Sequence, residues 1–132
     1  MKKRTFHGAD GSPYLTRWTL LNLGPLGRIV LHHFHRADAD PEMHDHPWPF
    51  LSLVLAGWYV EELGGCAEQI SRRRFSLAYR QAAIPHRVCA MPDEGCWTLL
   101  WTGPERGREW GFYTRDGWQP WWQFLRLPKP SH

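Results

Sequence analysis

Short segments rich in β-branched and aromatic residues recur along the chain, each bounded by glycine, proline or acidic residues. They span residues 14–23, 28–36, 50–62, 73–79, 82–90, 96–103 and 108–114. The breaks between them, such as GPLG, ADADPE, MPDEG and RDGWQP, have the composition of turns. No pattern with a 3.6-residue period continues for ten residues without a glycine or proline. The chain is therefore predicted to be all-β, with one short helix near residues 120–125.

Many short strands in a small chain favour a sandwich or a small barrel. A chain of 132 residues is expected to form one domain with its own core, over residues 14–125, flanked by short tails. The composition agrees, because nine Trp favour pleated surfaces while eleven Pro and twelve Gly favour turns.

The charge and the cysteines narrow the class of protein further. A net charge of +3 permits an anionic partner without requiring a nucleic acid. Cys66, Cys89 and Cys96 are odd in number and lack CxxC spacing, which argues against a disulfide framework or a cysteine-only zinc site. Reduced thiols and the lack of a signal-peptide pattern predict a cytoplasmic protein. No apolar run approaches the ~20 residues of a membrane helix.

Two histidines, His44 and His46, stand one residue apart just before an apolar segment. In an extended chain, residues i and i+2 point to the same side, so the pair aims two imidazoles at one point. Neutral imidazole is a ligand for zinc, iron, copper and nickel. An isolated HxH also occurs in turns and on polar surfaces, so this pair alone does not establish a metal site.

A metal site needs a third protein ligand, and His86 in IPHRV is the best candidate. A histidine buried in the core for packing is the alternative interpretation of His86. Alternation along a strand predicts which side chains share a face with the pair His44 and His46, and which share a face with His86. Those expected to share a face with His44 and His46 are Trp48, Phe50, Ser52 and Val54. Those expected to share a face with His86 are Arg80, Ala82, Ile84 and Val88.

Three further groups of residues have less specific patterns. His32, His33 and His35 are expected to form hydrogen bonds or to line a barrel mouth, where one of them could fix the tautomer of a ligand histidine. Trp97, Leu99 and Trp101 share one side of a strand and are expected in the core or the pocket wall. Trp118, Trp121 and Trp122 are expected to pack over a barrel end or to form a dimer contact.

Residues Arg72–Arg74 form a run of three basic residues. A solvated turn is the simpler interpretation, and contact with phosphate is the alternative. No P-loop or other nucleic-acid recognition motif is present, so a nucleic-acid partner is not expected.

The histidine pattern resembles that of the cupin superfamily, small β-barrels of the jelly-roll type. The first cupin motif is roughly G-x5-HxH-x3-E-x6-G, and His44, His46 and Gly57 match its spacing. Asp38 replaces the leading glycine, and Phe50 replaces the glutamate ligand.

The second cupin motif is matched less completely. It normally ends in a ligand histidine, which His86 supplies, while Gln81, Ala83 and Ala90 occupy the other key positions. The chain also resembles a group of small, uncharacterised cupin-like proteins of bacteria and phages. The shared phrases are HDHPW, FLSLVLAGWYVEE, PHRV, WTLLWTGP and WGFYTRDGW, within residues 28–122. This resemblance implies a jelly-roll fold, but it does not indicate a particular activity.

The resemblance implies a site of three histidines, similar to that of cysteine dioxygenase and related thiol dioxygenases. Three neutral imidazoles leave a divalent ion with its full charge, which attracts an anionic ligand. Arg80 is expected either to pair with a substrate carboxylate or to be a solvated charge at a strand end. Glu42 is a less favoured additional ligand, and Glu61 and Glu62 are expected on the surface.

Three functions are compatible with these residues. The first is an oxygenase of the thiol-dioxygenase kind, with iron favoured over zinc or nickel and a small anionic substrate. The second is a non-catalytic binder of metal or of a small molecule. The third is a structural or nucleic-acid-contacting protein with incidental histidines. Trp48, Phe50, Ser52, Arg80 and Trp101 are the expected pocket residues, and the resemblance implies a possible homodimer.

Overall fold

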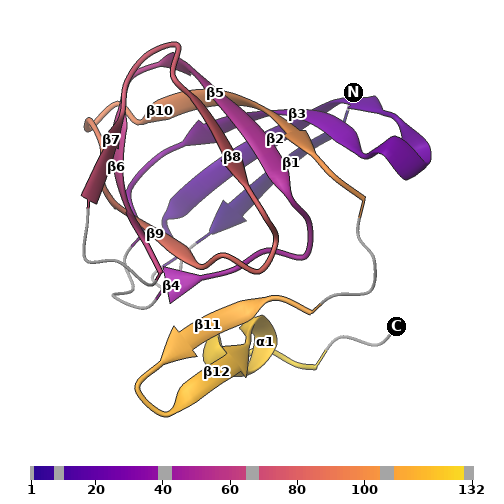
Figure 1. The fold of residues 1–132 in the computed structure, drawn as a ribbon, viewed down its shortest axis with the longest axis vertical. Helices are drawn as coiled ribbons and strands as arrows, with labels where there is room; N and C mark the ends of the chain where they lie inside the picture. Colours follow the sequence, from indigo (N-terminus) through magenta and orange to yellow (C-terminus); the bar gives the residue numbers. More distant parts are fainter. Residues whose placement is uncertain (1, 8–10, 39–42, 65–68, 105–108, 130–132) are drawn as a thin grey trace.

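A computed structural model describes residues 2–7, 11–38, 43–64, 69–104 and 109–129, which form two antiparallel sheets facing each other (Figure 1). The first sheet has the order β1 (Lys2–His7), β2 (Pro13–Asn22), β3 (Arg28–Phe34), β10 (Cys96–Thr102), β5 (Phe50–Ala56), β8 (Leu77–Arg80). The second has the order β12 (Gly117–Pro120), β11 (Gly111–Thr114), β4 (Met43–His44), β9 (His86–Ala90), β6 (Tyr59–Leu63), β7 (Gln69–Arg72). A 3-10 turn, η1 (Gly24–Leu26), and one helical turn, α1 (Trp121–Phe124), complete the described elements. The predicted all-β jelly roll is confirmed.

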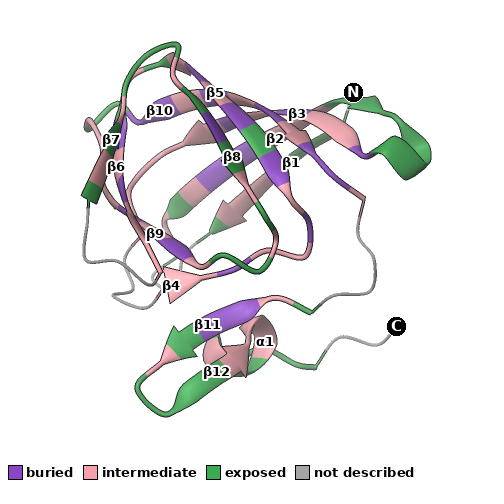
Figure 2. Ribbon diagram, viewed as in Figure 1, coloured by how far each residue is buried: buried purple, intermediate pink, exposed green. Residues whose placement is uncertain are grey.

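The core lies between the two sheets, and buried residues alternate with less buried ones along β5, β6, β9 and β10 (Figure 2). It has two apolar clusters. The first contains Val30, Trp48, Phe50 and Leu100. The second contains Val54, Tyr59, Val88 and Cys96. Burying each large apolar side chain contributes roughly 1.5–3 kcal/mol, so these clusters hold the sheets together.

The predicted strand over residues 50–62 is in fact two strands, β5 and β6, which lie in different sheets. The chain turns at Gly57, whose φ of 83° is in the left-handed region that favours glycine. A Cβ at Gly57 would also lie 2.8 Å from the backbone oxygen of Gly95. The apolar segment therefore contains a sharp turn between β5 and β6, and a residue with a side chain would not fit at this turn.

Several other strand boundaries differ from prediction. The N-terminal residues 2–7 were expected to be a tail, but they form β1, which pairs with β2. The predicted strand at 73–79 starts only at Leu77, because Phe75 has a φ of 68°. A turn also precedes β9, which begins at His86 rather than at residue 82. The short helix near residue 120 is confirmed by α1.

The prediction for β10 chose the wrong face. The buried positions are Cys96, Thr98, Leu100 and Thr102. Trp97, Leu99 and Trp101 alternate with these positions and lie on the outer face, where Trp97 stacks on Trp18 with ring centroids 5.5 Å apart. The outward-facing residues of β10 are more apolar than its inward-facing residues. The hydrophobic pattern alone therefore predicted the wrong face of this strand to be buried.

A C-terminal hairpin of β11 and β12, followed by α1, lies below the barrel beside β4 (Figure 1). Asp45 anchors it, because its fully buried carboxylate accepts a hydrogen bond of 2.7 Å from the Gly111 N–H. In the ladder between β11 and β4, Phe112 lies opposite His44. Trp121 stacks on Trp110, while Trp118, which was expected to pack over a barrel end or to form a dimer contact, is 40% exposed. The hairpin therefore covers the side of the barrel where His44 lies.

Among the described residues, no helix is both long and apolar enough to span a bilayer.

Candidate metal centre

Three histidines come together from β4, from the turn that follows it and from the start of β9. His44 and His86 are direct partners in the ladder between β4 and β9, and His46 follows two residues after His44. One ring nitrogen from each lies within 4.8 Å of the other two. In the described part of the chain, these are the residues whose arrangement suits a metal ion.

The ring nitrogens are close enough to share one ion. Nε2 of His46 and Nε2 of His86 are 2.8 Å apart. Two nitrogens that bind one ion at about 2.1 Å, at right angles to each other, stand about 3.0 Å apart. The nitrogens of His46 and His86 therefore suit one divalent ion after a shift of a few tenths of an ångström, and a ring nitrogen of His44 lies within 4.8 Å of both. Without an ion, the same contact is a single N–H···N hydrogen bond.

Burial keeps these imidazoles in the neutral form that binds metal. Burial, and after it neighbouring His86, lowers the pKa of His44 to about 4, while Asp38 acts in the opposite direction. Burial likewise lowers the pKa of His86 to about 4, while Asp38 acts in the opposite direction. The pKa of His46 is lowered well below its usual value, by burial first and then by His86. At pH 7 all three lone pairs are available for a cation.

A carboxylate stands behind each of two histidines. An oxygen of Asp38 lies 3.9 Å from Nδ1 of His44, and an oxygen of Glu61 lies 3.5 Å from Nδ1 of His86. Asp38 is fixed in turn, because it accepts hydrogen bonds from the Val88 N–H at 2.7 Å and from the Tyr14 hydroxyl. Neither contact is a hydrogen bond, since 3.9 Å is too long and Nδ1 of His86 has no hydrogen-bond partner among the described residues. Both carboxylates stand on the side from which a hydrogen-bonded carboxylate would orient a metal-binding imidazole.

The prediction that Glu61 lies on the surface is wrong, because its side chain is only 2% exposed. In the ladder between β6 and β9 it lies opposite the buried Val88, and it therefore faces the interior. Two cations compensate its charge: Arg72 donates to it at 3.1 Å, and Arg80 also contacts it. The side chain of Glu62 points to the opposite side of β6 and pairs with Arg87 at 3.4 Å. Its position is closer to the surface location predicted for it.

Aromatic rings surround the histidines. Trp48 stacks on His46 with ring centroids 5.0 Å apart, and Phe50 lies 5.2 Å from the same ring. On the other side, Phe112 lies 5.8 Å from His44. The chain is not a regular strand between His44 and Phe50, yet Trp48, Phe50, Ser52 and Val54 are all buried, as the alternation predicted. The aromatic shell limits access of water to the three imidazoles.

Not every expected pocket residue lies at the site. Trp101 lies on the outer face, where its indole N–H donates to the Leu26 carbonyl at 2.8 Å. Ile84 lies in the turn before β9 and is 39% exposed, so it does not form a pocket wall. Arg80 faces inward opposite Phe50, but its guanidinium contacts Glu61. Glu42 lies outside the described residues.

The second histidine cluster divides between the two faces of β3. His32 is buried, and its Nε2 accepts a hydrogen bond of 2.9 Å from Nε of Arg17. His33 and His35 point the other way, where His33 stacks on Trp97 with ring centroids 4.3 Å apart. Arg17, Asp38 and Glu61 are the interior charged residues that sequence reasoning did not identify. Strand alternation could have indicated Arg17 and Glu61, but Asp38 lies outside the strands and has no such signal.

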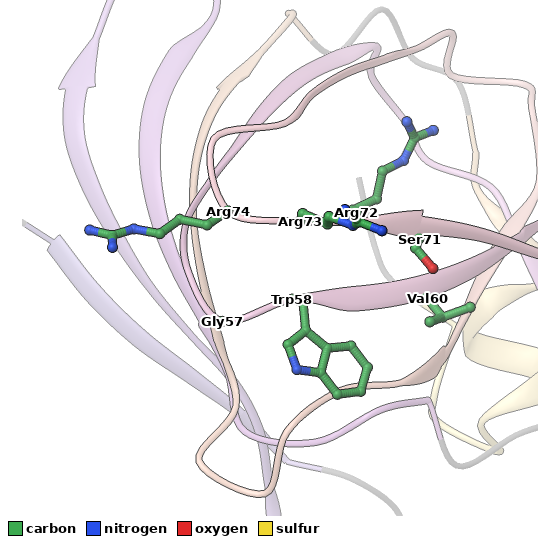
Figure 3. A pocket seen from close by; sticks show the side chains of 7 residues that line it. All are labelled: Gly57, Trp58, Val60, Ser71, Arg72, Arg73 and Arg74. Carbon is green, nitrogen blue, oxygen red and sulfur yellow. The ribbon is translucent and has the colours of Figure 1, made fainter.

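A surface pocket of about 390 Å³ lies away from the histidines, around the turn between β5 and β6 and the end of β7 (Figure 3). It is lined by Trp58 and by the basic run Arg72–Arg74, among others. The arginines do not converge, because Arg72 bonds to Glu61 while Nε of Arg74 donates to the Leu55 carbonyl at 3.0 Å. The pocket therefore lacks the arrangement of a built phosphate site.

No family model and no curated protein matches the sequence. Solved structures do match. A cupin-2 domain protein of Rhodospirillum rubrum is 16% identical, with 78% of this chain and 68% of that chain covered, at a TM-score of 0.61. KdgF from a Halomonas species is 17% identical, with 79% and 89% covered, at a TM-score of 0.57. Fe(II)-HppE with an alternative substrate is 14% identical, with 78% and 56% covered, at a TM-score of 0.59. These likenesses show that the chain has the cupin fold.

Proposed function

We propose that His44, His46 and His86 bind a divalent metal ion, and that the metal-loaded protein is an oxygenase of the thiol-dioxygenase kind that acts on a small anionic molecule. The observation that supports this most directly is the convergence of three neutral imidazoles, with two Nε2 atoms 2.8 Å apart. The matching HppE structure is that of the Fe(II) protein, which supports iron in preference to zinc or nickel.

The ligand set favours an anionic substrate. Phe50 occupies the position at which the cupin motif carries a glutamate, so the three ligands are neutral and the ion keeps a charge near +2. A bound iron would supply the redox chemistry of the reaction. The protein's own residues have other tasks: Asp38 and Glu61 hold the imidazoles in orientation, and Trp48 and Phe50 exclude water from the ion.

The first experiment is elemental analysis of the purified protein, after reconstitution with iron under reducing conditions. The variants His44→Ala and His86→Ala should lose the metal. His33→Ala is the matched control, because its ring stacks on Trp97 on the outer face. Near-stoichiometric iron in the wild type and the control, with loss in both site variants, supports the metal centre. A wild type without metal contradicts it.

Oxygen uptake separates the oxygenase from a non-catalytic metal binder. The iron-loaded protein is supplied with small thiols that carry a carboxylate, such as cysteine and 3-mercaptopropionate. Consumption of dioxygen that disappears in His86→Ala supports the oxygenase. A fully loaded protein that consumes none, or one that retains only zinc or nickel, supports the binder instead.

A further inference from the structure

The outer face of the first sheet carries two rows of apolar residues that cross its strands. The residues that alternate with them, such as Val30, Val54 and Leu100, are buried between the two sheets. One row, in the order of the ladders, is Ile29, Trp101, Leu51 and Tyr79. The other is Trp18, Leu31, Leu99, Leu53 and Leu77. These nine residues form the outer apolar face.

Much of the outer apolar face is open to solvent in the single chain. Leu77 is 63% exposed, Tyr79 is 54% exposed and Leu51 is 41% exposed. Figure 2 shows exposed stretches on β5 and β8, where these residues lie. The exposed Leu26 extends the face beyond Trp101, because its carbonyl accepts the hydrogen bond of the Trp101 indole. Apolar surface that water would otherwise cover is therefore concentrated on one side of the molecule.

Charged residues are missing from this side of four strands. In β3, β10, β5 and β8, which all lie within the described residues, no Asp, Glu, Lys or Arg occupies an outward position. An antiparallel sheet whose outer face meets water normally alternates apolar residues inside with polar residues outside. Here both faces of the sheet are apolar, which is the pattern of a sheet that is covered on both sides.

The extent of the face suits an interface between two chains. The strands from β2 to β8 stand about 4.8 Å apart, and the seven residues of β3, β5 or β10 span about 23 Å, so the face covers roughly 450 Å² in projection. Its accessible surface is larger than this projection, because side chains stand up from the sheet. A standard interface takes about 800 Å² of accessible surface from each partner, which the face approaches together with Leu26 at its rim.

We propose that the outer apolar face is the interface of a homodimer, in which two copies of the chain pack the outer faces of their first sheets together. The lack of charge favours a second copy, because identical faces then meet about a twofold axis without like charges opposite each other. Two antiparallel sheets pack face to face in this way in sandwiches, about 10 Å apart. An anionic membrane would instead favour basic residues beside the apolar ones, and the outward positions of these four strands have none.

This proposal assigns the homodimer implied by the cupin resemblance to a particular surface. The sequence-based alternative was a dimer contact through Trp118, Trp121 and Trp122, which lie in β12 and α1 beside the second sheet. The three histidines of the proposed metal centre also lie in or next to the second sheet, so the dimer is expected with or without a metal ion.

Sedimentation equilibrium of the full chain, over a wide range of protein concentration, measures the Kd of the dimer. Leu51→Glu and Tyr79→Glu each place a carboxylate on the outer apolar face at a position that is already exposed, and circular dichroism checks that the variants are folded. Leu125→Glu is the matched control, because Leu125 is 39% exposed, close to Leu51, but lies at the end of α1.

We expect the wild type and Leu125→Glu to dimerise with the same Kd, and each variant of the face to raise this Kd at least tenfold, because a twofold interface contains every substitution twice. Tyr79→Glu, on the edge strand β8, keeps the test decisive if Leu51→Glu fails to fold. A wild type that stays monomeric at every concentration overturns the proposal, and its sedimentation with phosphatidylglycerol vesicles would assign the face to a membrane. A dimer that neither variant of the face weakens, or that Leu125→Glu weakens equally, also overturns it.

Discussion

The carboxylate of Glu61 lies 3.5 Å from Nδ1 of His86, while Nε2 of the same ring lies 2.8 Å from Nε2 of His46. His86 therefore has a buried anion on one edge and the proposed metal position on the other. Nδ1 of His86 makes no hydrogen bond among the described residues, and a small approach of Glu61 would hold the ring in the tautomer that presents Nε2 to a cation.

Glu61→Gln should lower metal affinity about 10- to 100-fold, because the amide cannot supply the charge that raises the basicity of His86. Competition with a chelator of known affinity measures this change. Glu61→Ala should in addition destabilise the fold by roughly 3–5 kcal/mol, since Arg72 and Arg80 would lose their buried counter-charge. Glu62→Gln is the control, because Glu62 pairs with Arg87 outside the site. Unchanged metal affinity in Glu61→Gln would contradict the positioning role.

The metal-free protein should lose stability as the pH falls from about 6.5 toward 4. The folded-state pKa of His44 and of His86 is about 4, below the ordinary histidine value of 6.5. Below pH 6.5 the unfolded chain therefore binds protons that the folded chain does not, and stability declines until the pH reaches the folded-state pKa. A shift of this size corresponds to about 3 kcal/mol for each histidine.

Chemical denaturation of chelator-treated protein at several pH values measures this slope. Carboxylates also titrate in the lower part of the range, so the comparison is with His44→Gln, which should show a shallower decline. Equal slopes in the two proteins would mean that burial does not hold His44 neutral.

Asp45→Ala should loosen the C-terminal hairpin without unfolding the barrel. The substitution leaves the Gly111 N–H without its acceptor, at a cost of about 1–3 kcal/mol. Hydrogen exchange should accelerate in β11 and β12 and remain slow in β5 and β10. Asp116→Ala, at the exposed tip of the same hairpin, is the control. Uniform acceleration across both sheets would show that the hairpin and the barrel unfold as one unit.

Gly57→Ala should destabilise the protein more than Gly117→Ala. Both glycines have a positive φ, 83° and 111°, so both substitutions strain the backbone. Only at Gly57 would the new Cβ also meet a backbone atom, the Gly95 oxygen at 2.8 Å. Thermal unfolding of the two variants measures the difference, and equal losses would indicate that the corner between β5 and β6 can open.

The local features of this protein follow from its sequence alone. Turn residues and short apolar runs predicted the all-β class. The HxH spacing placed His44 and His46 together, because spacing along a strand fixes which neighbours share a side. His86 was selected as the third histidine from its place in IPHRV and from the resemblance to the cupin motif, and the ladder between β4 and β9 brings it opposite His44. Asp38 was noted only as a departure from the cupin motif, although its carboxylate lies behind His44.

Which side of each strand faces inward depends on the tertiary structure. Alternation with a period of two places Trp97 on the same side of its strand as Trp101, and Tyr59 on the same side as Glu61. It does not determine whether that side of the strand is buried. The packing of the two sheets makes that choice, and here it buries Glu61, His32 and Thr98 while the tryptophans of β10 face outward. The charges around the proposed site become neighbours only through pairing between distant strands, so no local pattern could reveal them.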